Sequence, residues 1–92
     1  MPDAPLKIEF TPRAADDVER LDPVVANRII NKLVWLSEHP ETKVERLVGM
    51  PARLDGLLKY RVGVYRVLFW LDDKALVIYR VGRRSEIYKD IK

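Results

Sequence analysis

The sequence predicts an α+β fold in two layers, in which a helical hairpin packs on a mainly antiparallel sheet. Residues 6–10 alternate apolar and polar side chains, as a half-buried strand does. Two amphipathic segments that begin with proline follow this strand, and three strand-like runs occupy most of the second half of the chain. The expected order of elements is therefore β-α-α-β-β-β-(α), which is typical of an α+β domain.

Both helices are predicted from their start signals and from the spacing of their apolar residues. A Thr-Pro pair at residues 11–12 supplies an N-cap and a proline at the first helical position, and an Asp-Pro pair at residues 22–23 repeats this signal. The second helix should end before Pro40, because the residue that precedes a proline disfavours helical geometry. We expect His39 to cap this helix rather than to take part in catalysis. The apolar stripe of the second helix is Val25, Ile29, Leu33 and Leu36.

The second half of the chain is predicted to form an antiparallel meander. Its strands are expected at residues 57–62, 65–71 and 74–81. Gly82 is expected to end the third strand, and residues 85–91 to form either a final helical turn or a short edge strand. Residues 42–56 have an irregular pattern that indicates a loop, with room for a short strand or a helical turn.

Length and composition limit the class of protein. The 92 residues form a single domain, residues 1–92, and their 48% hydrophobic content is enough for one core. The chain has no cysteine, which excludes disulfides and thiolate metal sites. No apolar run approaches the ~20 residues that span a bilayer, and residues 1–5 lack the pattern of a signal peptide. We therefore expect a cytoplasmic protein with no membrane contact, no metal and no cofactor.

Positive charge is concentrated in the second half of the chain. Residues 1–42 hold five Lys/Arg and eight Asp/Glu, a net charge of −3, whereas residues 43–92 hold twelve and six, a net charge of +6. A basic half on a small domain indicates a polyanionic partner, either nucleic acid or an acidic protein segment. A solvated sheet face would show the same pattern, so charge alone leaves both interpretations open.

Strand alternation gathers part of this charge on one face of the sheet. If each strand turns its more apolar side to the helices, Lys59, Arg61 and Arg66 share the opposite, open face. Three further residues leave the end of the last strand close to this face: Arg83, Arg84 and Tyr88. Because a guanidinium binds two phosphate oxygens at once, this arrangement suits a surface that recognises phosphate. The pattern alone, however, slightly favours an ordinary polar outer face of the sheet.

Three segments of the chain resemble the RelE/ParE superfamily of toxins: RLVGMP at residues 46–51, YRVGVYRVLF at residues 60–69 and VGRRSEIY at residues 81–88. The order of elements is also similar over nearly the whole chain. The resemblance implies the toxin of a type II toxin–antitoxin system, of the RelE-like kind that enters the ribosomal A site and cuts mRNA there without a metal. The implied partners are the 70S ribosome, its mRNA, and a cognate antitoxin that forms a hetero-oligomer with the toxin.

The resemblance also implies catalytic roles for four residues. Arg66 matches the arginine that holds the scissile phosphate, and Lys59 matches a lysine that activates the nucleophile or stabilises charge. Arg84 matches the arginine assigned to the leaving group. Tyr88 matches the C-terminal tyrosine that stacks on the substrate or orients it.

Two other basic residues are expected to bind substrate, namely Arg61 and Arg83, and Arg83 is an alternative to Arg84 at the leaving group. The chain also departs from the family pattern. Strongly active members often carry a second lysine where this chain has Leu57, and many carry histidine at the position of Arg83. Two alternatives to the nuclease therefore stay open: a ParE-like inhibitor of DNA gyrase without nuclease activity, and a degenerate member that only binds an antitoxin.

Overall fold

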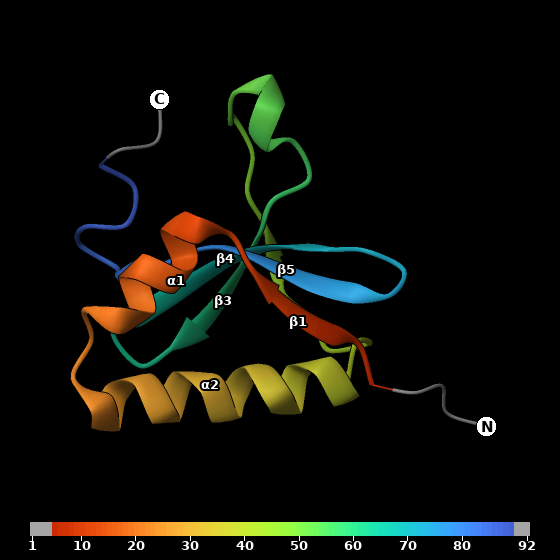
Figure 1. Cartoon of the computed structure of the whole chain (residues 1–92). Coiled ribbons are helices and arrows are strands. Elements are labelled where there is room, and N and C mark those ends of the chain that lie inside the picture. The colour runs from red at the N-terminus through yellow and green to blue at the C-terminus, as the bar shows by residue number, and fades with distance from the viewer. Residues whose placement is uncertain (1–4, 90–92) are drawn as a thin grey trace.

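A computed structural model describes residues 5–89 and shows a five-stranded sheet with two helices packed on it (Figure 1). The strands are β1 (Lys7–Phe10), β2 (Glu45–Arg46), β3 (Leu58–Val62), β4 (Tyr65–Leu71) and β5 (Ala75–Arg83). The helices are α1 (Pro12–Glu19), α2 (Pro23–Glu38) and the short 3-10 helix η1 (Ala52–Leu54). The predicted two-layer α+β architecture is confirmed. Neither α1 nor α2 has the length and apolar character that a membrane-spanning helix needs, and the same holds for every helix within residues 5–89.

The sheet has the strand order β1-β5-β4-β3-β2. Only β1 runs parallel to its neighbour, β5, and the other neighbouring pairs are antiparallel. The register places Arg66 of β4 between Arg61 of β3 and Gly82 of β5. Residues that lie opposite one another in neighbouring strands share a face, so these three positions form one row across the sheet.

Both helix starts follow the sequence signals. Thr11 Oγ1 accepts a hydrogen bond of 3.1 Å from the Ala14 N–H, and Asp22 Oδ1 accepts one of 2.9 Å from the Val24 N–H. The helix α2 ends at Glu38, and His39 is its C-cap. Each cap satisfies backbone groups that the helix itself leaves without a partner, so the predicted boundaries of α2 are confirmed.

The main core lies between the helices and one face of the sheet. Its largest fully buried members include Phe69, Ile29 and Leu33, so the predicted stripe of α2 does face the sheet. The alternate residues of β3 also point into this core: Leu58, Tyr60 and Val62. The basic residues between them must then point to the other face.

The strand β5 continues through Gly82 to Arg83, and the prediction that Gly82 ends it was wrong. A Cβ at Gly82 would lie only 3.6 Å from the Cβ of Ile87. The segment after β5 therefore packs on the sheet at Gly82, and the glycine does not break the strand. A Cβ at this position would make only an ordinary van der Waals contact, so the packing does not require glycine. Residues 84–89 form turns rather than an edge strand, and the Ile87 N–H donates to the Arg83 carbonyl at 2.9 Å, as in a helical turn. Residues 90 and 91 of this predicted segment lie outside the described residues.

A β-bulge changes the alternation of β5 at Tyr79. Leu68 is in register with Arg80 but Phe69 with Ile78, so Tyr79 is the extra residue. Strict alternation would place Arg80 on the same face of the sheet as Ile78, in the main core. Because of the bulge, Val81 takes that place in the core instead. Sequence periodicity cannot show such an insertion, because it assumes a constant period of two.

Arg80 instead connects β5 to α1. Its Nε lies 2.8 Å from Asp17 Oδ2, which also accepts a 2.9 Å hydrogen bond from the Val81 N–H. The side chains of Arg80 and Asp17 are only 11% and 10% exposed. This carboxylate thus satisfies a backbone donor of β5 as well as a largely buried guanidinium, and we expect its removal to be strongly destabilising.

Candidate functional site

The candidate site is the face of the sheet that points away from α2. Lys59 and Arg61 of β3 and Arg66 of β4 lie on it, because their neighbours along each strand pack into the main core. The sequence predicted this grouping, and the register brings Arg61 and Arg66 directly opposite each other. Two like charges placed opposite one another repel unless an anion or another device separates them.

This face is partly covered by a second, smaller apolar cluster. Figure 1 shows the segment that carries η1 and the residues after β5 both projecting from the sheet on the side away from α2. Their side chains meet those of the sheet in a buried group that consists of Leu54, Leu57, Leu68 and Ile87. Around it are packed Leu47, Met50, Trp70, Tyr79 and Tyr88. The basic residues therefore lie beside an apolar cluster that covers part of this face of the sheet.

Arg66 is buried, at 6% exposure, which differs from the open position that the sequence indicated. Its Nη1 donates hydrogen bonds of 2.9 Å to the carbonyl of Gly63 and 2.8 Å to the carbonyl of Tyr65. Gly63 adopts a φ of 60° in the turn between β3 and β4, a conformation that favours glycine. The guanidinium thus braces this turn.

Lys59 and Arg61 differ in their surroundings. Lys59 Nζ lies 3.4 Å from Glu45 Oε1 of β2, and the Lys59 side chain is 22% exposed. Arg61 is exposed. Glu45 therefore offsets part of the charge of Lys59, a contact that sequence reasoning missed because β2 has only two residues and no recognisable period.

The two arginines at the end of β5 occupy different positions. Arg83 is in register with Tyr65, which packs against the main core, and its guanidinium carbon lies 5.9 Å from the centroid of the Tyr65 ring. Arg83 is therefore on the helix side and is not brought together with Lys59 and Arg66. The side chain of Arg84 is exposed, and its backbone N–H donates to the Val64 carbonyl at 2.8 Å. Together with Val64 and Arg83, Arg84 lines a shallow pocket of about 370 Å³.

Tyr88 folds back over the candidate face as part of the second cluster. Its hydroxyl oxygen is buried and has no hydrogen-bond partner among the described residues. A buried hydroxyl without a partner costs free energy, so the hydroxyl of Tyr88 does not stabilise the fold.

We expect Tyr88→Phe to keep the free energy of unfolding unchanged or to raise it by about 1 kcal/mol, because it removes the unpartnered hydroxyl. Tyr88→Ala should lower it by roughly 2 kcal/mol, since the ring packs in the second cluster. Because the hydroxyl is buried, we also expect Tyr88→Phe to retain most of any RNA cleavage and Tyr88→Ala to lose it. Denaturant unfolding and single-turnover cleavage on programmed ribosomes would measure both. An equal loss of cleavage in the two variants would show that the hydroxyl itself transfers a proton.

Two aromatic residues on the same face were not assigned a role from the sequence. The rings of Trp70 and Tyr79 lie 5.2 Å apart at an angle of 58°. Trp70 Nε1 donates to the Asp55 carbonyl at 3.0 Å, and Arg53 Nη1 lies 3.5 Å from the Tyr79 hydroxyl. These contacts fasten the η1 segment to the sheet. Trp70 was detectable from the alternation of β4, but Tyr79 was not, because the bulge falls at this residue.

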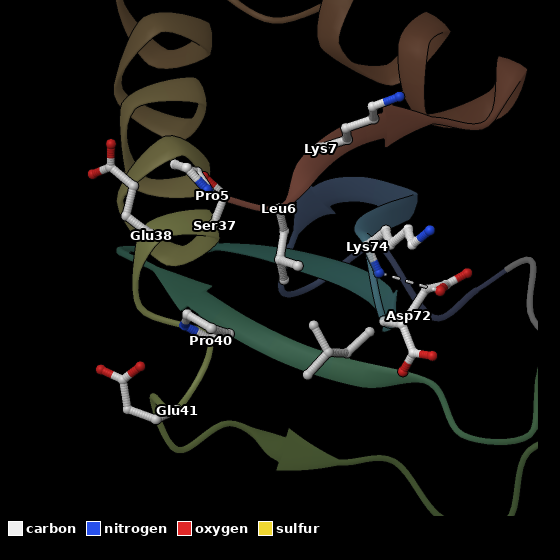
Figure 2. Close-up of a pocket in the computed structure, with 11 residues that line it drawn as sticks. Pro5, Leu6, Lys7, Ser37, Glu38, Pro40, Glu41, Asp72 and Lys74 are labelled. Atoms are coloured by element: carbon white, nitrogen blue, oxygen red, sulfur yellow. Dashed lines mark hydrogen bonds between the residues drawn. The ribbon is translucent and has the colours of Figure 1, made fainter. Parts of the chain in front are cut away.

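A larger cavity, of about 980 Å³, lies away from the basic residues, between the first described residues, the end of α2 and the turn between β4 and β5. Figure 2 shows Leu6 pointing into this space, with Glu38 and Glu41 on one side of it and Asp72 and Lys74 on the other. Four carboxylates and two lysines line it, and this excess of negative charge disfavours the phosphates of a nucleic acid. The basic face, rather than this cavity, is therefore the candidate site for a polyanion.

A helical hairpin on one face of a five-stranded sheet, with basic residues and a C-terminal tyrosine at the other face, defines the class of small toxin domains to which RelE and ParE belong. The family model described as the ParE toxin of the type II toxin–antitoxin system parDE matches residues 8–88. The chain belongs to this family and is a toxin of a type II toxin–antitoxin system.

Solved structures show the same similarity. The toxin–antitoxin complex RelBE2 from Mycobacterium tuberculosis contains a chain that is 29% identical, with a TM-score of 0.74 over 89% of this chain and 94% of that chain. The intact RelBE complex of E. coli gives 26% identity and a TM-score of 0.68 over 85% and 95% of the two chains. The isolated E. coli RelE toxin gives 28% identity and a TM-score of 0.68 over 88% of each chain. A search of curated proteins gives no match.

Proposed function

We propose that this toxin cuts mRNA on the 70S ribosome and thereby inhibits translation. The observation that carries the proposal is the row of basic side chains on one sheet face, in which Arg66 stands opposite Arg61, with Lys59 on the same strand as Arg61. Tyr88 folds over the same face. Cleavage by the ribose 2′-OH needs cations around a phosphate and an aromatic ring to orient the nucleotide, and this face supplies both.

Each residue has a role in the proposed reaction. The 2′-oxygen forms a bond to phosphorus and loses its proton to a water molecule, the bond from phosphorus to the 5′-oxygen breaks, and that oxygen gains a proton from water. Arg66 contacts the phosphate, whose negative charge grows in the transition state. Because Lys59 is ion-paired with Glu45, we assign to it the stabilisation of charge rather than the removal of the proton. Arg84 stabilises the leaving oxygen, since Arg83 is engaged with Tyr65.

The proposed reaction depends on the ribosome for a physical reason. Neither lysine nor tyrosine is a strong base at neutral pH, so the side chains of this face supply charge stabilisation rather than efficient proton transfer. Holding the mRNA in a reactive geometry must then provide much of the rate enhancement. In this proposal Arg61 binds the RNA backbone beside the scissile phosphate, and free RNA is cut slowly.

A second candidate is a ParE-like inhibitor that binds DNA gyrase and cuts nothing. Two observations favour it. Arg66 and Lys59 both contact groups of the protein itself, the first the turn carbonyls and the second Glu45. The family model that matches is that of ParE. A degenerate member that only binds an antitoxin would show the same contacts.

Induction of this chain without an antitoxin should arrest growth, with protein synthesis falling before DNA replication. The physical reason is that the basic set lies on one face of the sheet, where its positive charge would attract the phosphates of RNA. Incorporation of labelled amino acids and of labelled thymidine, followed in parallel after induction, would measure both processes. If thymidine incorporation falls before protein synthesis, the toxin is instead an inhibitor of DNA gyrase. Unimpaired growth would favour a degenerate member that only binds an antitoxin.

The cognate antitoxin provides the control for this experiment. The similar chains from Mycobacterium tuberculosis and E. coli were solved as toxin–antitoxin complexes, and we propose that this chain likewise forms a hetero-oligomer with its own antitoxin. Co-expression of that antitoxin should restore growth and the incorporation of both labels. An antitoxin that covers the basic face would neutralise its charge and also bury apolar surface, so moderate salt should weaken the complex only modestly.

A further inference from the structure

One stripe along α2 carries functional groups that neither the core nor the candidate site uses. Arg28, Asn31, Lys32 and Trp35 follow one another at the i, i+3, i+4 and i+7 spacing that places side chains on one helix face. Together with Tyr60 of β3 they line a pocket of about 400 Å³. Tyr60 belongs to the helix side of the sheet, so this pocket lies on the opposite side of the sheet from Lys59 and Arg66.

The indole of Trp35 is exposed and at the same time held in place. It is 44% exposed, although it is one of the largest apolar side chains of the protein. The imidazole of His39 stacks on it, with ring centroids 4.2 Å apart and planes at 14°. His39 is itself fixed, because its Nδ1 lies 2.8 Å from the Trp35 carbonyl oxygen. A flat ring that is ordered before a ligand arrives loses little conformational entropy on binding.

The other groups of the pocket define the charge of a suitable ligand. Arg28 and Lys32 are cationic and exposed, and no carboxylate is among the residues that line this pocket. Asn31 supplies an amide, which can donate and accept hydrogen bonds at the same time. An exposed aromatic ring, an amide and two cations on adjacent helical turns match the base and the phosphates of a nucleotide.

We propose that this pocket is a second RNA contact, in which a base of single-stranded RNA stacks on Trp35 while Arg28 and Lys32 hold the adjacent phosphates. Asn31 contacts the edge of the base. An acidic peptide would also be attracted to the two cations, but it would make no use of an indole that is already ordered by His39. The site is separate from the proposed cleavage face, and its existence does not depend on whether that face cuts RNA.

Binding of a short oligouridine with 2′-O-methyl groups tests the proposal, because this probe lacks the 2′-OH and cannot be cleaved by the proposed reaction. Fluorescence anisotropy of the labelled probe with the full chain should show saturable binding. Trp35→Ala should weaken it about ten-fold, since stacking of one base contributes ~1–3 kcal/mol. Trp35→Phe should keep most of the affinity, because a phenyl ring still stacks.

Two matched pairs of variants distinguish the contributions of stacking and of charge in the pocket from the effects of any nearby substitution or of any lost positive charge. Val34→Ala changes the exposed neighbour of Trp35 and should leave the affinity unchanged. Lys32→Ala should lower the slope of log affinity against log salt by ~0.7, whereas Lys74→Ala removes the same charge outside the pocket and should change the slope little. Equal affinity of native protein and Trp35→Ala, with the fold intact by circular dichroism, would overturn the proposal. Equally tight binding of an oligoglutamate of the same charge would overturn it too.

Discussion

Arg66→Ala is expected to lower the rate of mRNA cleavage on the ribosome by ~10²–10³-fold, the usual cost of losing one preorganised donor to a transition-state charge. The guanidinium has two functions at this position. Its Nη1 braces the turn through the carbonyls of Gly63 and Tyr65, and its other N–H groups are the ones that we assign to the phosphate. Arg66→Lys should rescue only part of the rate, because an ammonium cannot bind carbonyls and phosphate in one plane.

The structural function of Arg66 must be separated from its proposed catalytic one. Arg66 is 6% exposed, so the alanine variant will also lose stability. Rates should therefore be normalised to the folded fraction, measured by circular dichroism under the same conditions. Arg20→Ala is the matched control, because Arg20 is 78% exposed and forms only a surface ion pair with Asp16. A native cleavage rate in folded Arg66→Ala would show that the active site does not include this residue.

Asp17→Ala is expected to lower the free energy of unfolding by about 3 kcal/mol, because it leaves a buried guanidinium and a backbone N–H without their shared acceptor. For a domain of this size the melting temperature should fall by roughly 12–24 °C. The loss is large because Asp17 Oδ2 serves both Arg80 and the Val81 N–H. Thermal unfolding followed by circular dichroism would measure it.

The neighbouring aspartate provides the control for this prediction. Asp16→Ala removes the same side chain one position earlier, where the carboxylate is 48% exposed and pairs with Arg20 on the same helix. It should change stability by less than about 1 kcal/mol. Asp17→Asn keeps an acceptor for the Val81 N–H and should fall between the two alanine variants. Equal melting temperatures for Asp16→Ala and Asp17→Ala would contradict the stabilising role of the buried pair.

The positions of the helices, and the side of the sheet on which the residues of β3 lie, could be predicted because short-range rules determine both. Thr11 and Asp22 cap helices whose first residue is proline, and an alternating strand places Lys59 and Arg61 on the same side. The extent of β5 could not be predicted in this way. Gly82 signals a break locally, but the strand continues through it and Ile87 packs against it. That contact depends on the tertiary fold.

The grouping of basic residues on the candidate face was predictable only in part. Periodicity grouped Lys59, Arg61 and Arg66, yet it gave no sign that Arg66 is buried or that Glu45 pairs with Lys59. Both facts depend on segments without a period, namely the turn at Gly63 and the two-residue strand β2. Periodicity also could not predict on which side of the sheet Arg83 lies, because the bulge at Tyr79 shifts the alternation of β5 after that residue.

The parallel pairing of β1 with β5 limits how early the sheet can be completed during synthesis. Lys7 pairs with Ala75 and Phe10 with Ile78, so the first strand finds its partner only after most of the chain has been synthesised. Contacts of such high sequence separation close a long loop, which slows folding and delays the completion of the core. Until residues 75–83 have left the ribosome, β4 has no partner on one side and Arg66 cannot take its place in the row beside Gly82. In the function proposed above, the nascent toxin should therefore lack its complete basic row until synthesis is nearly finished.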